Sequence, residues 1–264
     1  MTNSAVRWFH SYRTTPDPEL RLVCFPHAGG APTAYWSWAN AVPKKIEVLA
    51  TCYPGRQDRM GEPFAPSLQA MADDIASALR PLADVPLALF GHSMGSVVTH
   101  EVALRLDADH GIAPVRLFVS GSEAPHRRER EESQPESDAD FLAQLRGLGH
   151  SSLAAIEDPA LLQLVLPSIR ADYRLSAAYR PAEVARRHRA PLVAYAGAED
   201  AHCTTEDLTA WSQYTAGTFE TRVFPGDHFY LQAQEQPLLT HITGHLTADL
   251  RLRRVLNAAR RTHG

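Results

Sequence analysis

The segment from Gly91 to Gly95, Gly-His-Ser-Met-Gly, constrains the fold most strongly. It follows an apolar run that ends at Phe90 and precedes a helical pattern that begins at Ser96. A serine between two glycines, at the turn from a strand to a helix, is typical of a tight turn that exposes the hydroxyl above a sheet. Side chains at the glycine positions would collide with neighbouring backbone. The segment therefore predicts a layered arrangement of strands and helices.

Apolar runs and helical patterns alternate along most of the chain. The expected strands are residues 20–25, 46–52, 86–90, 115–120, 191–196 and 219–224. The expected helices are residues 34–42, 67–82, 96–106, 206–214 and 237 to the C-terminus. Several strands are apolar almost throughout, as in parallel sheets that are covered on both faces. The order predicts an α/β fold with a mostly parallel, doubly wound sheet.

Length and composition indicate one soluble globular domain that covers residues 1–264. Hydrophobic residues make up 44% of the 264 residues and charged residues 21%, as in ordinary folded domains. The net charge of -4 makes nucleic acid an unexpected partner. No signal peptide or membrane-spanning run is visible, and three cysteines cannot all pair, so we expect a cytoplasmic protein without membrane association.

The alternation is interrupted at about residues 123–180, which we interpret as a helical insertion. Residues 138–148 and 160–179 have helical patterns, and Pro167 is expected to kink or divide the second. An insertion before the last two strands is expected to lie over the carboxyl ends of the sheet as a lid. The alternative is that these helices pack away from any site. The mixed-charge run at residues 127–132 is interpreted as a solvated start of the insertion.

Ser93 requires a general base to become a nucleophile, and in α/β-hydrolases the acid and the histidine follow the serine along the chain. His228 lies in a turn after the last expected strand, whereas His241 and His245 fall in the terminal helical pattern and are interpreted as solvated. Asp200 and Glu199 both follow the penultimate strand. Asp200 is favoured as the acid because it lies far enough past the strand to turn back. Asp227 is expected to shape the turn beside the histidine.

Backbone N–H groups must stabilise the oxyanion that forms during acyl transfer. One donor comes from the residue after the nucleophile, which is Met94. The glycine-rich loop after the first expected strand supplies the other, and we choose Ala28. Such a loop could instead hold a phosphate, but it lacks the Gly-x-Gly-x-x-Gly spacing of dinucleotide folds.

Several further motifs make the chain similar to the type II thioesterases, which edit modular polyketide and nonribosomal peptide synthetases. The motifs are Phe25-Pro26-His27-Ala28-Gly29-Gly30, Tyr35-Trp36-Ser37-Trp38, Tyr53-Pro54-Gly55-Arg56 with Arg59, the segment around Ser93, Gly197 with Asp200, and Gly226-Asp227-His228-Phe229. Ala198, His202 and Cys203 depart from the family pattern. The resemblance implies an α/β-hydrolase with a helical lid and the catalytic triad Ser93, Asp200 and His228.

The resemblance also implies a substrate and partners. Acyl groups would be hydrolysed from the phosphopantetheine arm of acyl or peptidyl carrier proteins, with no metal or cofactor. Leu161, Leu164 and Leu166 of the insertion are expected to provide apolar contacts for the acyl chain. From the residues alone, Arg56 and Arg59 are interpreted as solvated arginines beside a tight turn. The alternatives are a carboxylesterase or transacylase on the same fold and a non-catalytic module that binds carrier proteins.

Overall fold

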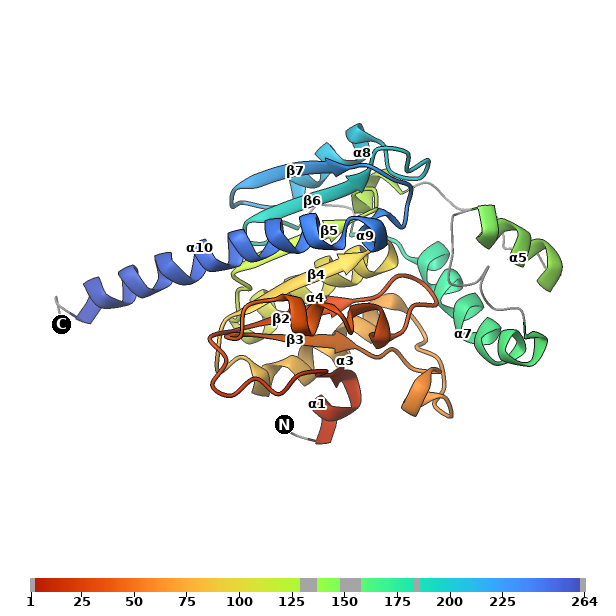
Figure 1. The fold of residues 1–264 in the computed structure, drawn as a ribbon, viewed down its shortest axis with the longest axis horizontal. Coiled ribbons are helices and arrows are strands. Elements are labelled where there is room, and N and C mark those ends of the chain that lie inside the picture. The colour runs from red at the N-terminus through yellow and green to blue at the C-terminus, as the bar shows by residue number, and fades with distance from the viewer. Residues whose placement is uncertain (1–2, 129–136, 148–157, 183–185, 262–264) are drawn as a thin grey trace.

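A seven-stranded sheet lies at the centre of the computed structural model, which describes residues 3–128, 137–147, 158–182 and 186–261 (Figure 1). The strands are β1 (Phe9–His10), β2 (Leu20–Phe25), β3 (Ile46–Thr51), β4 (Leu87–His92), β5 (Arg116–Ser120), β6 (Leu192–Gly197) and β7 (Phe219–Phe224). Their order across the sheet is β1-β3-β2-β4-β5-β6-β7. Only the β1–β3 pair of this sheet is antiparallel. The predicted α/β fold is confirmed.

Helices cover both faces of the sheet. In the described part of the chain, the helices are α1 (Asn3–Trp8), α2 (Trp38–Ala41), α3 (Leu68–Leu79), α4 (Met94–His110), α5 (Asp138–Gly147), α7 (Pro159–Ala178), α8 (Thr205–Ala210), α9 (Tyr230–Ala233) and α10 (Glu235–Arg261), of which α5 and α7 belong to the insertion. Short 3₁₀ helices span Pro32–Tyr35, Gln57–Arg59, Arg80–Leu82, Pro125–Arg127 and Trp211–Tyr214. Alternate residues of each strand point to opposite faces. In β2, Val23 packs in the cluster with α3 and α4, and Leu22 packs in the cluster with α10.

All six expected strands are present. The first and last have the predicted bounds, because polar or turn-forming residues flank each apolar run. Sequence analysis missed β1, which has only two residues and pairs with β3 through Phe9↔Thr51 and His10↔Ala50. A strand of this length carries no periodic signal. Its place at the edge of the sheet is therefore visible only in three dimensions.

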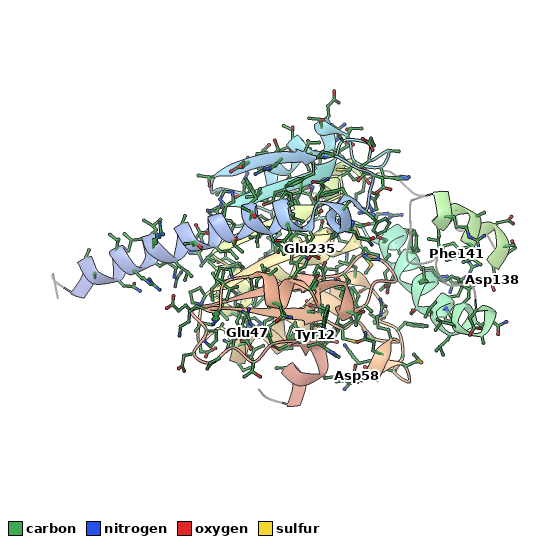
Figure 2. The ribbon with its side chains drawn as sticks, in the orientation of Figure 1. Tyr12, Glu47, Asp58, Asp138, Phe141 and Glu235 are labelled. Atoms are coloured by element: carbon green, nitrogen blue, oxygen red, sulfur yellow. The ribbon has the colours of Figure 1, made fainter. Side chains whose placement is uncertain are left out.

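The insertion helices α5 and α7, called the lid helices below, lie beyond the carboxyl ends of the strands (Figure 1). Pro167 was expected to kink or divide the second helix. It does not divide the helix, because α7 continues through this residue. On either side of Pro167, Leu166 and Ile169 are buried in a small cluster with Phe141 of α5, so packing supports both halves of α7 (Figure 2). The lid helices thus share a small core of their own. Residues 129–136, including part of the charged run, lie outside the described residues.

The three cysteines are free and buried. Burial raises the pKa of the Cys24 thiol, and it raises the pKa of Cys52 and of Cys203 to about 12. These thiols behave as small apolar side chains rather than as nucleophiles. Separately, none of the helices in the described residues is long and apolar enough to cross a membrane.

Candidate active site

Ser93 lies at the turn between β4 and α4, with a positive φ of 56°. Positive φ is strained for a residue with a side chain and persists where the surroundings impose it. A Cβ added to Gly91 would lie 1.9 Å from the Gly95 carbonyl oxygen, and one added to Gly95 would lie 2.1 Å from the Phe25 carbonyl oxygen. Only glycine fits at either position. The turn therefore has the backbone that the sequence predicts.

Strand β5 holds this turn in place. The Ser93 N–H donates to the Ser120 carbonyl oxygen at 2.7 Å. Ser96 is fully buried, and its hydroxyl accepts from the Ser120 N–H at 2.9 Å and lies 2.9 Å from the Gly91 carbonyl oxygen. Ser96 was not among the predicted site residues. A polar residue in the first turn of a helix that is otherwise buried is the signal that could have shown it.

His228 follows β7 and lies next to Asp200, which follows β6. His228 Nδ1 is 2.9 Å from Asp200 Oδ2, and the carboxylate is completely buried. The other carboxylate oxygen accepts from the His202 N–H at 2.9 Å. A Cβ added to Gly197 would lie 2.2 Å from the Asp227 carbonyl oxygen, so this glycine allows the two loops to approach closely. An imidazole held in this way keeps one tautomer, with Nε2 available as a base.

The other two carboxylates near His228 have different surroundings. Glu199 is exposed, and its backbone N–H donates to the Gly226 carbonyl oxygen. The Asp227 side chain accepts from the Phe229 N–H at 2.8 Å, which is the turn-shaping contact expected of it. Of the three candidates, Asp200 is the carboxylate that lies at hydrogen-bonding distance from the histidine ring.

A pocket of about 110 Å³ brings four of the expected site residues together, which are Ala28, Ser93, Met94 and His228. It is lined by Ala28, Ser93, Met94, Gly121, Ser122, Glu123, Arg128, Tyr173, Ser176, His202 and His228. Met94 is the first residue of α4, where N–H groups have no acceptor within the helix. Its N–H is therefore available to a ligand, at the end of the helix that favours negative charge. Ala28 lies on the other loop of the pocket.

Gly121, which sequence analysis also missed, makes room for the histidine. It follows β5 with a φ of +57°, and an added Cβ would lie 2.7 Å from the His92 ring and 3.3 Å from the His228 ring. The His92 and His228 rings pack with their centroids 5.0 Å apart. A glycine directly after a strand of a parallel sheet is the sequence signal for this close approach.

The three lid leucines do not line the described pocket. Leu161 and Leu164 are 44% and 51% exposed, and Leu166 packs in the lid core with Phe141. The part of α7 that reaches the pocket is further along, at Tyr173 and Ser176. The sequence identifies apolar residues on a helix but does not show which end of the helix lies over the nucleophile. The contact of these three leucines with an acyl chain therefore stays a prediction.

A buried ion pair connects the lid to the loop that contains Ala28. Asp172 of α7 accepts from Arg56 Nη1 at 2.6 Å and from Nη2 at 2.7 Å, and the side chains are only 3% and 7% exposed. Asp172 also accepts from the Gly29 N–H at 2.7 Å, and Arg56 donates to the Gly30 carbonyl oxygen at 2.9 Å. The pair thus contacts both residues that follow Ala28.

Arg56 and Arg59 are both buried, contrary to the interpretation from the residues alone. Arg59 is 4% exposed and donates to the Cys52 carbonyl oxygen at 2.8 Å. Its guanidinium also lies over the Trp8 ring, 4.0 Å from the centroid. Asp172, the partner of Arg56, and Trp8, beneath Arg59, come from segments that sequence spacing does not connect to these arginines.

Asp172→Asn is expected to lower the free energy of unfolding by about 3–5 kcal/mol, because it leaves the Arg56 charge buried without a counter-ion. Chemical denaturation of the purified variant measures this loss. Asp138→Asn is the matched control. Asp138 of α5 pairs with Arg170, which lies on α7 like Asp172, but the Asp138 side chain is 67% exposed. The control should change stability by less than about 1 kcal/mol. Equal losses in the two variants would contradict the assigned importance of the buried pair.

A strained serine at the end of a parallel strand, in one pocket with a histidine that a buried carboxylate contacts, defines a serine hydrolase of the α/β-hydrolase fold. Residues 20–250 match the thioesterase domain family. The chain belongs to this thioesterase family.

Individual relatives narrow the class. Thioesterase PikA5 of Streptomyces venezuelae is 35% identical over 242 residues, which cover 90% of this chain and 85% of the relative. Gramicidin S biosynthesis protein GrsT of Aneurinibacillus migulanus is 31% identical over 234 residues, which cover 88% of this chain and 91% of GrsT. The solved structure of the type II thioesterase BorB, from the borrelidin biosynthetic cluster, matches with a TM-score of 0.84 at 36% identity. The match covers 90% of this chain and 97% of the BorB chain. The chain is a type II thioesterase of polyketide and nonribosomal peptide pathways.

Proposed function

We propose that Ser93, His228 and Asp200 form the catalytic triad that hydrolyses acyl thioesters on the phosphopantetheine arm of carrier proteins. Ser93 Oγ attacks the thioester carbonyl carbon while His228 takes the hydroxyl proton. The C–S bond then breaks, and His228 returns the proton to the leaving thiolate. A water molecule, activated by His228, cleaves the acyl-enzyme ester and releases the carboxylic acid. Asp200 holds the imidazole and stabilises its protonated form throughout.

The backbone N–H groups of Ala28 and Met94 are the proposed oxyanion donors. Both residues line the pocket that contains Ser93. Donors fixed by backbone structure need no reorganisation when charge develops on the carbonyl oxygen, which makes them effective in a partly enclosed site. The ion pair between Arg56 and Asp172 supports the loop of the first donor from the lid side.

One observation carries the proposal above the others: the buried Asp200 carboxylate lies 2.9 Å from His228, in the pocket that Ser93 also lines. The chain's similarity to type II thioesterases supports carrier-bound thioesters as the substrate class. A carboxylesterase or transacylase would use the same three groups. Only the substrate and the acceptor of the acyl group distinguish these activities.

The test compares one acyl group on three carriers: a phosphopantetheinylated carrier protein, a small pantetheine thioester and a matched oxygen ester. We expect kcat/KM to be highest for the carrier protein, by about tenfold or more over the small thioester, which corresponds to about 1.4 kcal/mol of added binding. Free acid should be the product even when an amine or alcohol acceptor is added. Preference for the oxygen ester, or transfer to the acceptor, would instead support the esterase or the transacylase.

The non-catalytic alternative has a separate outcome in the same experiment. A module that only binds carrier proteins would retain the acylated carrier protein in a pull-down without releasing acid. It would also leave Ser93 unlabelled by a fluorophosphonate probe. Either result with folded protein contradicts the proposed hydrolysis.

A further inference from the structure

Two histidines and a glutamate meet on the face of the sheet that α10 covers. His241 and His245 are four residues apart on α10, so their side chains point the same way, and their ring centroids are 4.7 Å apart. Glu220 of β7 reaches both, with Oε1 3.0 Å from His241 Nε2 and Oε2 3.3 Å from His245 Nε2. The expectation that both histidines are simply solvated is therefore corrected, because their side chains are only 15% and 22% exposed.

The spacing of these atoms suits a zinc ion. Nitrogen and oxygen ligands lie about 2.0–2.1 Å from tetrahedral Zn²⁺, which places neighbouring ligand atoms about 3.3 Å apart. The nitrogens of the two histidines lie at close to this distance, 3.0 and 3.3 Å, from different oxygens of the Glu220 carboxylate. One ligand atom from each of the three residues lies within 4.8 Å of the other two. Two imidazoles and one carboxylate are also a ligand set that zinc uses in proteins. Small side-chain shifts would therefore complete three of the four positions.

A hydrogen bond behind one ligand strengthens the case. His241 Nδ1 lies 2.9 Å from the hydroxyl of Tyr195 on β6. When that nitrogen carries the proton and donates to the hydroxyl, Nε2 is left unprotonated and faces Glu220. Metal-binding histidines are commonly oriented by such a contact on the second ring nitrogen.

Two arginines lie near the site, and one of them is paired with a carboxylate. Arg116 is paired with Asp249 through two contacts of 2.7 Å, which offset its charge. Arg222 lines the same hollow and lies 5.0 Å from the centre of the Phe224 ring. The hollow beside the histidines has a volume of about 620 Å³, which leaves the fourth coordination position open to water.

We propose that Glu220, His241 and His245 form a binding site for a zinc-like divalent transition-metal ion, separate from the catalytic pocket. The ion joins the last strand of the sheet to the C-terminal helix. It binds the folded chain, in which the three ligands converge, more tightly than the unfolded chain and therefore stabilises the fold. Because none of the three residues lines the pocket around Ser93, the ion has no part in the proposed hydrolysis.

The test titrates zinc chloride into the full chain after removal of metal by a chelator. Isothermal titration calorimetry should show one site, and the melting temperature should rise as zinc is added. His241→Asn and His245→Asn should each weaken zinc binding at least tenfold and remove the thermal shift. Tyr195→Phe should weaken binding by about 10–100-fold while all three ligands remain, as expected for a group that orients a ligand.

Two control variants separate this site from others. His110→Asn removes a histidine at the end of α4 and should leave zinc affinity unchanged. Asp58→Asn tests the second group of possible ligands in the described residues, which is His10, Cys52 and Asp58. The proposal is overturned when wild-type protein binds no zinc, or when binding persists in both α10 variants. Loss of binding in Asp58→Asn alone would assign the ion to the second group.

Discussion

Ser93→Ala is expected to abolish thioester hydrolysis, with kcat falling on the order of 10⁶-fold, as when the nucleophile of a serine protease is removed. The variant lacks the only atom that forms the acyl-enzyme bond in the proposed mechanism. Steady-state release of free acid from an acyl-carrier protein measures the loss. A fluorophosphonate probe should label the wild-type protein and leave the variant unlabelled.

The fold of this variant should be intact. Alanine at position 93 experiences the same positive φ as serine, and the N–H that donates to the Ser120 carbonyl oxygen is unchanged. Circular dichroism and the melting temperature should therefore match the wild type. Ser212→Ala, at an exposed position outside the pocket, is the control and should retain full activity. Activity in folded Ser93→Ala close to the wild-type rate would refute its role as nucleophile.

Asp200→Asn is expected to lower kcat by about 10⁴-fold, the loss found for the equivalent change in another serine hydrolase. An amide at this position can donate a hydrogen bond to His228 Nδ1, which favours the tautomer whose Nε2 carries the proton. That tautomer cannot accept the proton of Ser93. The side chain keeps its size in a fully buried site, so the loss should appear mainly in kcat.

Glu199→Gln is the matched control because it makes the same chemical change at the neighbouring residue. The Glu199 side chain is exposed, and the contact it makes through its backbone survives the substitution. Its rate should remain within a few-fold of the wild type. If Glu199→Gln is the slower of the two variants, the acid of the triad must be reassigned.

The strands were the most predictable part of the fold. The apolar runs at residues 20–25 and 219–224 correspond to β2 and β7 without an error at either end. Helix α4 begins at Met94, two residues before the predicted start, because the helical periodicity becomes visible only after the second glycine of the turn. For the lid, the periodicity gave the extent of α7 but not its contacts. A helical pattern shows which face of the helix is apolar, but it does not show which residues pack against that face.

The residues of the site likewise include some that the sequence predicts and some that it does not. Chain order favours Ser93, Asp200 and His228, because each follows the carboxyl end of a strand and these ends share one edge of the sheet. It does not separate Asp200 from Glu199, which follows the same strand. The pair of Arg56 and Asp172 has no such rule. Its members are 116 positions apart, and neither stands in a pattern that requires a partner of opposite charge. The contact between Glu220 and the two α10 histidines was missed for the same reason.

The burial of all three cysteines makes this chain convenient for site-directed labelling. A maleimide reacts with an accessible thiolate, and each native thiol is both enclosed and held in its protonated form by a raised pKa. The native cysteines can therefore stay in place, which avoids cavities in the core. A single Leu164→Cys substitution, at a half-exposed position of α7, would carry a fluorophore that reports on the lid alone.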